Sequence, residues 1–332
     1  MSNDGCALSI DLGGTKVEIA IVDPQGTILT HERLPTHVEN GAERVVEDIL
    51  SGATALMQRS SYKIIAVGAG VAGQISSNGK EVLFAPNLKW RNFPFKEKLE
   101  KRLSLPCTIL NDVRAATWGE WLHGAGKNCS DFLCLFLGTG IGGGIVAGGH
   151  LINGFSNAAG ELGHTTLREG GRLCSCGHRG CLEAYAGGWG IAVTLKEAAT
   201  SSPKKAAALI ALAGGDAKAL KAEHLSEAVK KNDPFAQEIY SQVIKSLSNG
   251  CVTFVNAFNP KLLIFGGGVA LGMPMLLEKV QEEVKKSALG ATGSPLQVIP
   301  ATLGNTAVVI GAAAAALQSA TFGSDSLRVH SA

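Results

Sequence analysis

The sequence Ile10-Asp11-Leu12-Gly13-Gly14-Thr15-Lys16 decides how the rest of the chain is interpreted. Apolar residues 7–10 predict a short buried strand, and the two glycines leave room for backbone N–H groups to surround an anion. Thr15 and Lys16 add a hydroxyl and a cation, and Asp11 is placed to hold a hydrated Mg²⁺ beside a phosphate. A plain hairpin turn is the alternative, because two glycines between strands are common. We interpret the stretch as a phosphate-binding turn.

The composition indicates a globular α/β protein of two domains. The chain has 332 residues, 45% of them hydrophobic, and 30 Lys and Arg against 28 Asp and Glu leave a formal charge of +2. So balanced a charge does not indicate a nucleic-acid or membrane surface. The first residues do not resemble a signal peptide, and no apolar run reaches the roughly 20 residues that a membrane helix needs. We therefore expect a cytoplasmic protein that binds neither nucleic acid nor membranes.

One order of elements occurs twice: strand, glycine loop, strand, turn, strand. It occurs first over 7–34 and again over 132–152, where the loop reads Gly138-Thr139-Gly140-Ile141-Gly142-Gly143-Gly144. The repeat predicts duplicated α/β domains of βββαβαβα type that face one ligand across a cleft. We expect a small domain at 1–122 completed by a C-terminal helix at 306–317, a larger domain at 123–305 with a zinc-binding loop at 164–181, and a tail at 319–332.

Hydrophobic spacing predicts most of the other elements. We expect strands at 64–67, 107–110, 261–265 and 296–299. We expect helices at 41–58, 95–103, 113–122, 234–258 and 273–289, with further helices within 187–231. A glycine-rich ligand loop is expected at 68–74, directly after a strand.

Asn111 and Asp112 stand where a predicted strand ends and a predicted helix begins. Free backbone N–H groups and the helix dipole attract an anion at such a point. A catalytic Asp112 would accept a hydroxyl proton as that oxygen attacks phosphorus, and Asn111 would fix the substrate. The alternative is a helix cap, a role in which Asp and Asn are both favoured.

The strongest local pattern is a cluster of cysteines. Cys174, Cys176 and Cys181 lie within eight residues, and with one histidine they can complete a tetrahedral zinc site. Four protein ligands leave no open position for water, so the zinc should be structural. His164 is the favoured fourth ligand, and His178 is the rival inside the tight turn.

Two carboxylates flank this cluster in the chain. Glu161 precedes His164 by three residues, and Glu183 follows Cys181 by two. A pair of carboxylates brought together by a zinc loop would suit a polyol, whose hydroxyls each donate a hydrogen bond. Solvated surface charge is the alternative.

These motifs together resemble the ROK family of bacterial sugar kinases and repressors, over residues 8 to about 317. The resemblance is carried by the turn at 11–16, the Asn111-Asp112 pair, the loop at 138–144, Glu161-x-x-His164 and the cysteine run that ends at Glu183. It implies an actin-like, hexokinase-like fold of two α/β domains. It also implies Mg-ATP as the donor and phosphorylation of a hexose at its 6-hydroxyl.

The resemblance further implies a role for each motif. Asp112 is the base. The sugar is held by Asn111, Asp112, Glu161, His164 and Glu183, with Gly73 and Asn87 as further pocket positions. His164 gives one ring nitrogen to zinc and the other to a sugar hydroxyl, and Cys174, Cys176 and Cys181 complete the zinc shell. The nucleotide is expected at Asp11, Gly13, Gly14, Thr15, Lys16, Gly138, Thr139, Gly140, Gly142, Gly143, and, on the adenosine side, Gly266, Gly267 and Gly268.

Glucose is the expected hexose, and N-acetylglucosamine or N-acetylmannosamine is the runner-up. A ROK-type transcriptional repressor is the rival from another class. It is disfavoured because only a handful of residues precede the strand at 7–10, too few for a helix-turn-helix. We expect a homodimer.

Overall fold

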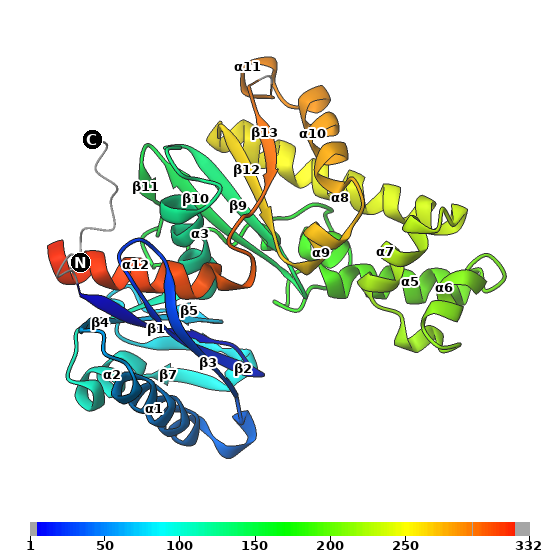
Figure 1. Cartoon of the computed structure of the whole chain (residues 1–332). Coiled ribbons are helices and arrows are strands. Elements are labelled where there is room, and N and C mark those ends of the chain that lie inside the picture. The colour runs from blue at the N-terminus through cyan, green and yellow to red at the C-terminus, as the bar shows by residue number, and fades with distance from the viewer. Residues whose placement is uncertain (1–4, 294, 323–332) are drawn as a thin grey trace. The chain divides into compact units, whose positions relative to one another are not determined.

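The structure, a computed structural model, describes residues 5–293 and 295–322. It forms two compact units (Figure 1). The first unit takes the described residues of Met1–Ser130, Gly144–Gly160 and Thr302–Ala332, and the second takes those of Asp131–Gly143 and Glu161–Ala301.

This division differs from the expected boundary near residue 122, because Gly144–Gly160 belongs to the first unit. Hydrogen bonds explain the assignment. Arg114 donates to Asn157, and Asn157 Nδ2 donates to the carbonyl oxygen of Ser76 over 3.0 Å. Hydrogen bonds to Arg114 and to Ser76 therefore tie the segment Gly144–Gly160 to the first unit.

The first unit is built on a five-stranded sheet. Its order is β3-β2-β1-β4-β8, with β1 antiparallel to β2 and parallel to β4. The strands are β1 (Cys6–Leu12), β2 (Lys16–Val22), β3 (Ile28–Pro35), β4 (Ile64–Val71) and β8 (Cys107–Asn111). β1 and β2 are buried along nearly their whole length, including the polar Ser9 and the charged Glu18.

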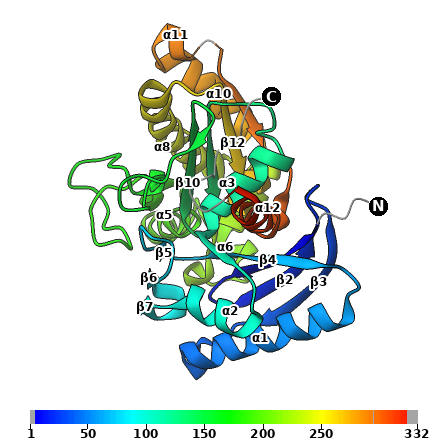
Figure 2. The ribbon, with the colours of Figure 1, turned by 90° about the vertical axis from the view of Figure 1, so that its left-hand side faces the viewer.

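Helices cover both faces of this sheet. α1 (Ala42–Arg59) and α2 (Phe95–Leu103) lie on one face, and α12 (Ala307–Phe322) lies on the other and packs against α3 (Asp112–His123) (Figures 1 and 2). α1 buries its apolar stripe, as its spacing predicted. Short 3-10 helices occur at η1 (Val38–Asn40) and η5 (Gly304–Thr306).

The expected glycine loop at 68–74 is wrong in its first half, because β4 runs on to Val71. A Cβ atom at Gly68 would lie 2.0 Å from the carbonyl oxygen of Ala312, and one at Gly70 would lie 2.3 Å from a methyl of Val308. These two glycines therefore let α12 approach the strand closely.

The C-terminal helix is longer than expected. α12 continues to Phe322, so residues 319–322 are helical rather than part of a tail, and residues 323–332 lie outside the described chain. The helical segment Gly304–Phe322 is long and apolar enough to cross a membrane by length and composition alone. Its apolar residues are instead used in packing against α3, β4 and β1.

A three-stranded antiparallel sheet was not predicted. It consists of β5 (Gln74–Ile75), β6 (Val82–Ala85) and β7 (Trp90–Phe93), with η2 (Pro86–Leu88) between the last two strands. Strands of two to four residues are too short to show a hydrophobic period.

The second five-stranded sheet repeats the pattern of the first. Its order is β11-β10-β9-β12-β13, which matches β3-β2-β1-β4-β8 position by position and confirms the predicted duplication. The strands are β9 (Phe132–Leu137), β10 (Ile141–Ala147), β11 (His150–Leu151), β12 (Leu262–Gly266) and β13 (Gln297–Pro300). The glycine loop is shorter than expected, because Gly142, Gly143 and Gly144 lie in β10.

Helices make up most of the second unit. They are α4 (Glu183–Ala186), α5 (Gly188–Ser201), α6 (Ala207–Leu212), α7 (Ala222–Lys230), α8 (Pro234–Phe258), α9 (Gly268–Gly272), α10 (Leu276–Ser287) and α11 (Gly290–Gly293), with η3 (Leu162–His164) and η4 (Ala217–Ala219). The helix expected at 273–289 is α10, which begins three residues later because α9 and a turn precede it.

Candidate active site

The turn after β1 is a hairpin turn that is closed by backbone bonds. Gly13 N–H donates to the carbonyl oxygen of Lys16 (3.0 Å), and Thr36 Oγ1 donates to the carbonyl oxygen of Gly13 (2.8 Å). A Cβ atom at Gly14 would lie 2.8 Å from Asn87 Cβ, so only glycine lets Asn87 approach. The structure thus brings Asn87 against the turn.

Lys16 makes an ion pair that the sequence did not indicate. Its Nζ lies 3.0 Å from Glu18 Oε1, and the same buried carboxylate binds His31 and Arg33. Burial alone would raise the pKa of Glu18, but hydrogen bonds from Lys16, His31 and Arg33 outweigh it and lower the pKa. Glu18 therefore holds the Lys16 ammonium beside the turn.

Asn111 and Asp112 have different roles at the start of α3. Asn111 is the helix cap, because its side-chain oxygen accepts from Arg114 N–H (3.1 Å). Its Nδ2 donates to the carbonyl oxygen of Gly73 (3.2 Å) and to Asp112 Oδ1 (3.0 Å). Capping thus accounts for Asn111, while Asp112 is the first residue of the helix.

The charge of Asp112 affects the pKa of Asp11, which lies near the end of β1. Burial and, to a smaller extent, the charge of Asp112 raise the pKa of Asp11 from 3.8 to about 7, although Lys16 acts in the opposite direction. Two carboxylates that repel each other are stabilised by a divalent cation between them. This part of the first unit therefore fits the expected Mg²⁺.

A cavity of about 730 Å³ lies within the second unit. The predicted nucleotide residues Gly138, Thr139 and Gly268 line it. The rest of its wall comes from α5, α7 and the end of α9, including Trp189, Lys221, Glu223, Ser226, Glu227 and Lys230. None of these wall residues was singled out from the sequence, because the pattern of a helix shows its apolar face but not which cavity that face meets.

The glycine loop is fixed against α5. Gly188 N–H donates to the carbonyl oxygen of Gly138 (3.0 Å), and Trp189 N–H donates to that of Thr139 (2.9 Å). Gly267 has a positive φ of 87° and packs against Leu137, so a glycine is needed here for the conformation of the backbone. Gly140, Gly142, Gly143, Gly266 and Gly267 are absent from the residues that line this cavity.

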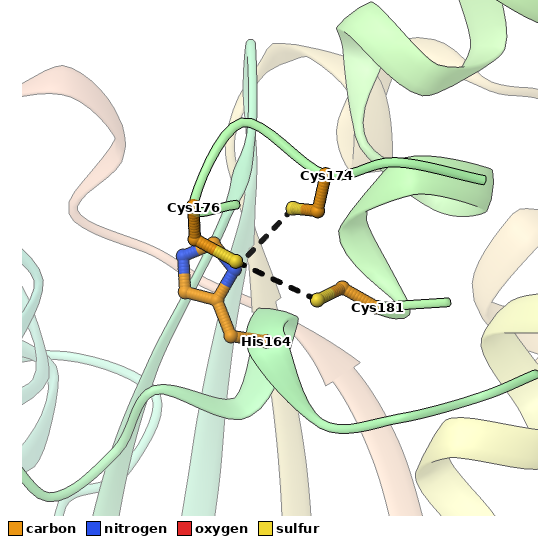
Figure 3. A group of neighbouring side chains, drawn as sticks. All are labelled: His164, Cys174, Cys176 and Cys181. Carbon is orange, nitrogen blue, oxygen red and sulfur yellow. Dashed lines mark hydrogen bonds between the residues drawn. The ribbon is translucent and has the colours of Figure 1, made fainter. Parts of the chain in front are cut away.

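Four side chains of the second unit converge as a potential metal site (Figure 3). The ligand atoms of His164, Cys174, Cys176 and Cys181 all lie within 4.8 Å of one another. Cys174 Sγ is 3.6 Å from His164 Nδ1, and Cys176 Sγ is 3.7 Å from Cys181 Sγ. A tetrahedral zinc ion would place its ligand atoms roughly 3.6 to 3.8 Å apart, so the group fits.

The rival ligand His178 is outside this group and is exposed. It contributes its carbonyl oxygen, which accepts from Cys174 N–H over 2.8 Å. Because Nδ1 of His164 points to the cysteines, Nε2 is the ring nitrogen left for a second partner.

The thiols of the cluster differ in acidity. Burial raises the pKa of Cys181 to about 12 and also raises that of Cys174. Burial acts in the same direction on Cys176, but hydrogen bonds from the His178 backbone and from the neighbouring cysteines lower its pKa. A metal that binds here must therefore displace protons from at least two thiols.

The two flanking carboxylates differ in burial. Glu161 is exposed just before η3, whereas Glu183 is only 7% exposed at the start of α4. Glu183 Oε2 accepts from Ile141 N–H (2.8 Å), and Oε1 accepts from Ser175 Oγ (3.2 Å) and Trp189 Nε1 (3.0 Å). Glu183 is therefore more constrained than a surface charge.

Known proteins resemble this chain along nearly its whole length. A curated glucokinase from Streptomyces coelicolor is 36% identical over 310 residues, which cover 93% of this chain and 96% of that protein. A solved structure of a ROK family glucokinase from Streptomyces griseus in complex with glucose and AMPPNP has a TM-score of 0.81 and 36% identity, covering 95% of this chain and 100% of that one. A xylose repressor from Bacillus spizizenii is 29% identical over 311 residues, which cover 92% of this chain and 76% of the repressor.

These likenesses confirm the expected actin-like sugar-kinase fold. The model of the ROK family matches residues 7–319. The chain belongs to the ROK family.

Proposed function

We propose that the protein is an ATP-dependent glucokinase, which transfers the γ-phosphate of ATP to the 6-hydroxyl of glucose. The observation that carries the proposal is the carboxylate of Asp112 at the start of α3, close enough to the partly buried Asp11 for its charge to help raise the pKa of Asp11. Glucokinases that are 33–36% identical over most of the chain, and a solved neighbour bound to glucose and AMPPNP, support the same reaction.

In this proposal Asp112 accepts the proton of the 6-hydroxyl as its oxygen attacks the γ-phosphorus. Asn111, held by Gly73 and by its capping bond, orients Asp112 through the 3.0 Å hydrogen bond to Oδ1. Asp11 would hold Mg²⁺, which when bound neutralises charge on the phosphates. The turn at Gly13, Gly14, Thr15 and Lys16 would surround the phosphates from the first unit.

We assign the nucleotide base and ribose to the 730 Å³ cavity of the second unit. Gly138, Thr139 and Gly268 would lie against the nucleotide, while Gly140, Gly142, Gly143, Gly266 and Gly267 would support the backbone of these loops. Cavities of this size are typical of small-molecule sites.

The residues proposed to hold the hexose are Gly73, Asn87, Asn111, Asp112, Glu161, His164 and Glu183. Zn²⁺ on His164, Cys174, Cys176 and Cys181 would be structural, since four protein ligands fill its shell. His164 would then offer Nε2–H to a sugar oxygen. We further propose a cytoplasmic homodimer without nucleic-acid or membrane partners.

A coupled phosphorylation assay over a panel of sugars tests the proposal. With ATP and Mg²⁺ we expect the highest kcat/KM for glucose, in a panel that also contains N-acetylglucosamine, N-acetylmannosamine, fructose and mannose. A preference for an N-acetylhexosamine would replace the substrate but keep the reaction. Sugar binding by calorimetry without phosphorylation of any sugar would favour a sugar sensor like the repressor relatives.

A further inference from the structure

We propose that Glu183 is a positioning residue that links the metal loop, residues 164–181, to the nucleotide cavity, so that loss of the metal weakens nucleotide binding even without sugar. The inference rests on the proposed function, because it takes the 730 Å³ cavity as the nucleotide site. All residues involved belong to the second unit.

Glu183 joins three separate segments through one buried carboxylate. Oε2 accepts from the N–H of Ile141, the residue that follows the glycine loop at 138–140. Oε1 accepts from Ser175, which stands between the metal ligands Cys174 and Cys176, and from the indole N–H of Trp189.

Two of these segments form the cavity wall. Trp189 lines the cavity, and its backbone N–H holds the carbonyl oxygen of Thr139, which also lines it. Gly140 lies directly on the carboxylate, since a Cβ atom there would come within 2.3 Å of Glu183 Oε2. The position of the Glu183 carboxylate therefore sets the position of the glycine loop.

The third segment depends on the metal. Ser175 is exposed and has potential metal ligands on both sides, so a metal bound to Cys174 and Cys176 would fix its hydroxyl toward Glu183. Without the metal, the buried carboxylate loses a donor, and its remaining bonds to Ile141 and Trp189 must readjust. A hydrogen bond to a charged group changes an equilibrium constant by about tenfold or more.

The test measures the Kd of a non-hydrolysable ATP analogue, without sugar, by calorimetry. The protein is used loaded with Zn²⁺, stripped by a chelator, and reloaded. We expect Kd to rise about tenfold on stripping and to return on reloading. Reciprocity adds a second readout: the analogue must tighten Zn²⁺ binding by the same factor, which a chromogenic chelator measures.

Ser175→Ala tests the route. It removes the hydroxyl but none of the metal ligands, so the loaded variant should already bind the analogue at least about threefold more weakly, and stripping should then have less effect than in the unsubstituted protein. The matched control is Arg179→Ala in the same loop, an exposed side chain that donates a hydrogen bond to the carbonyl oxygen of Gly171 over 3.3 Å. This control should keep the full effect of stripping.

Trp189 provides a spectroscopic signature, because the other three tryptophans lie in the first unit. Stripping and nucleotide addition should both change the fluorescence, and the change should be lost in Trp189→Phe. Equal Kd values for loaded and stripped protein, or an unchanged effect of stripping in Ser175→Ala, would overturn the inference. If circular dichroism shows that stripping unfolds the protein, the test is the comparison of the Kd of the analogue between the loaded Ser175→Ala and Arg179→Ala proteins. Failure of the loaded protein to bind the analogue at all would instead contradict the proposed function.

Discussion

The raised pKa of Asp11 predicts that Asp11→Asn stabilises the ligand-free protein while it weakens Mg-nucleotide binding. Asp11 is ionised in the unfolded chain above 3.8, but in the folded protein only above about 7. Between these pH values the folded protein binds a proton that the unfolded chain lacks, so this residue lowers the free energy of unfolding as the pH rises. Asparagine resembles the neutral carboxyl, so Asp11→Asn removes this loss of stability at higher pH.

The size of the effect follows from the two pKa values. They are roughly three pH units apart, and each unit corresponds to about 1.4 kcal/mol, which gives an upper bound of about 4 kcal/mol. Asp11 is partly accessible to solvent, which screens the repulsion, so we expect about 2 kcal/mol. The stability difference between variant and wild type should grow from near zero at pH 4 to this value at pH 8.

Urea unfolding at a series of pH values measures this difference. In a Trp189→Phe background the remaining tryptophans, Trp90, Trp118 and Trp121, all lie in the first unit, so their fluorescence follows that unit. Glu97→Gln, an exposed carboxylate on α2, is the control and should change little at any pH. An Asp11→Asn protein that is no more stable at pH 8 than at pH 4, relative to wild type, would refute the reasoning.

Two other predictions concern the metal loop and the first core. Chelation or Cys176→Ser should lower the sugar affinity and the unfolding temperature together. Metal analysis should find the ion retained in His178→Ala but lost in His164→Ala, and equal metal content in the two variants would contradict the ligand assignment. Gly311→Ala should destabilise the first unit by about 3 kcal/mol in urea unfolding, because the added Cβ would lie 1.7 Å from the carbonyl oxygen of Ala115 on α3. Gly290→Ala is the control, because no atom would lie within 4 Å of the added Cβ. Similar losses of stability in both proteins would show that α3 and α12 can move apart without cost.

Much of the fold was predictable because its signals are local. α2 has the bounds that its spacing predicted, Phe95–Leu103, and β9 has those expected from an apolar run, Phe132–Leu137. The repeated order of strands and glycine loops indicated the duplication, which the two sheet orders confirm. The spacing of each helix and the apolar run of each strand lie within neighbouring residues, and the repeat is visible as two similar segments of the chain.

The errors arose where glycine serves close packing rather than a turn. Gly68 and Gly70 were taken for a ligand loop, but they admit α12, which lies more than 200 residues later in the chain. Gly144 likewise leaves space for Thr117, whose Oγ1 would lie 1.9 Å from a Cβ atom there. The sequence around a glycine does not reveal such a distant partner.

The candidate site was predictable only in part for the same reason. Motifs placed Asn111, Asp112 and the four potential metal ligands, because each group is compact in sequence or belongs to a known pattern. The α7 wall of the cavity and the bonds of Glu183 to Ser175 and Trp189 depend on how helices and loops pack. Tertiary structure was needed to find them.

The most direct test of the account is the turnover of Asp112→Asn with ATP, Mg²⁺ and glucose, measured beside the Kd of glucose by calorimetry. The amide is nearly the same size as the carboxylate but cannot accept the proton, so kcat should fall about 10²- to 10⁴-fold while the Kd stays within about threefold. A folded Asp112→Asn protein with a kcat close to that of wild type would contradict the assignment of Asp112 as the base.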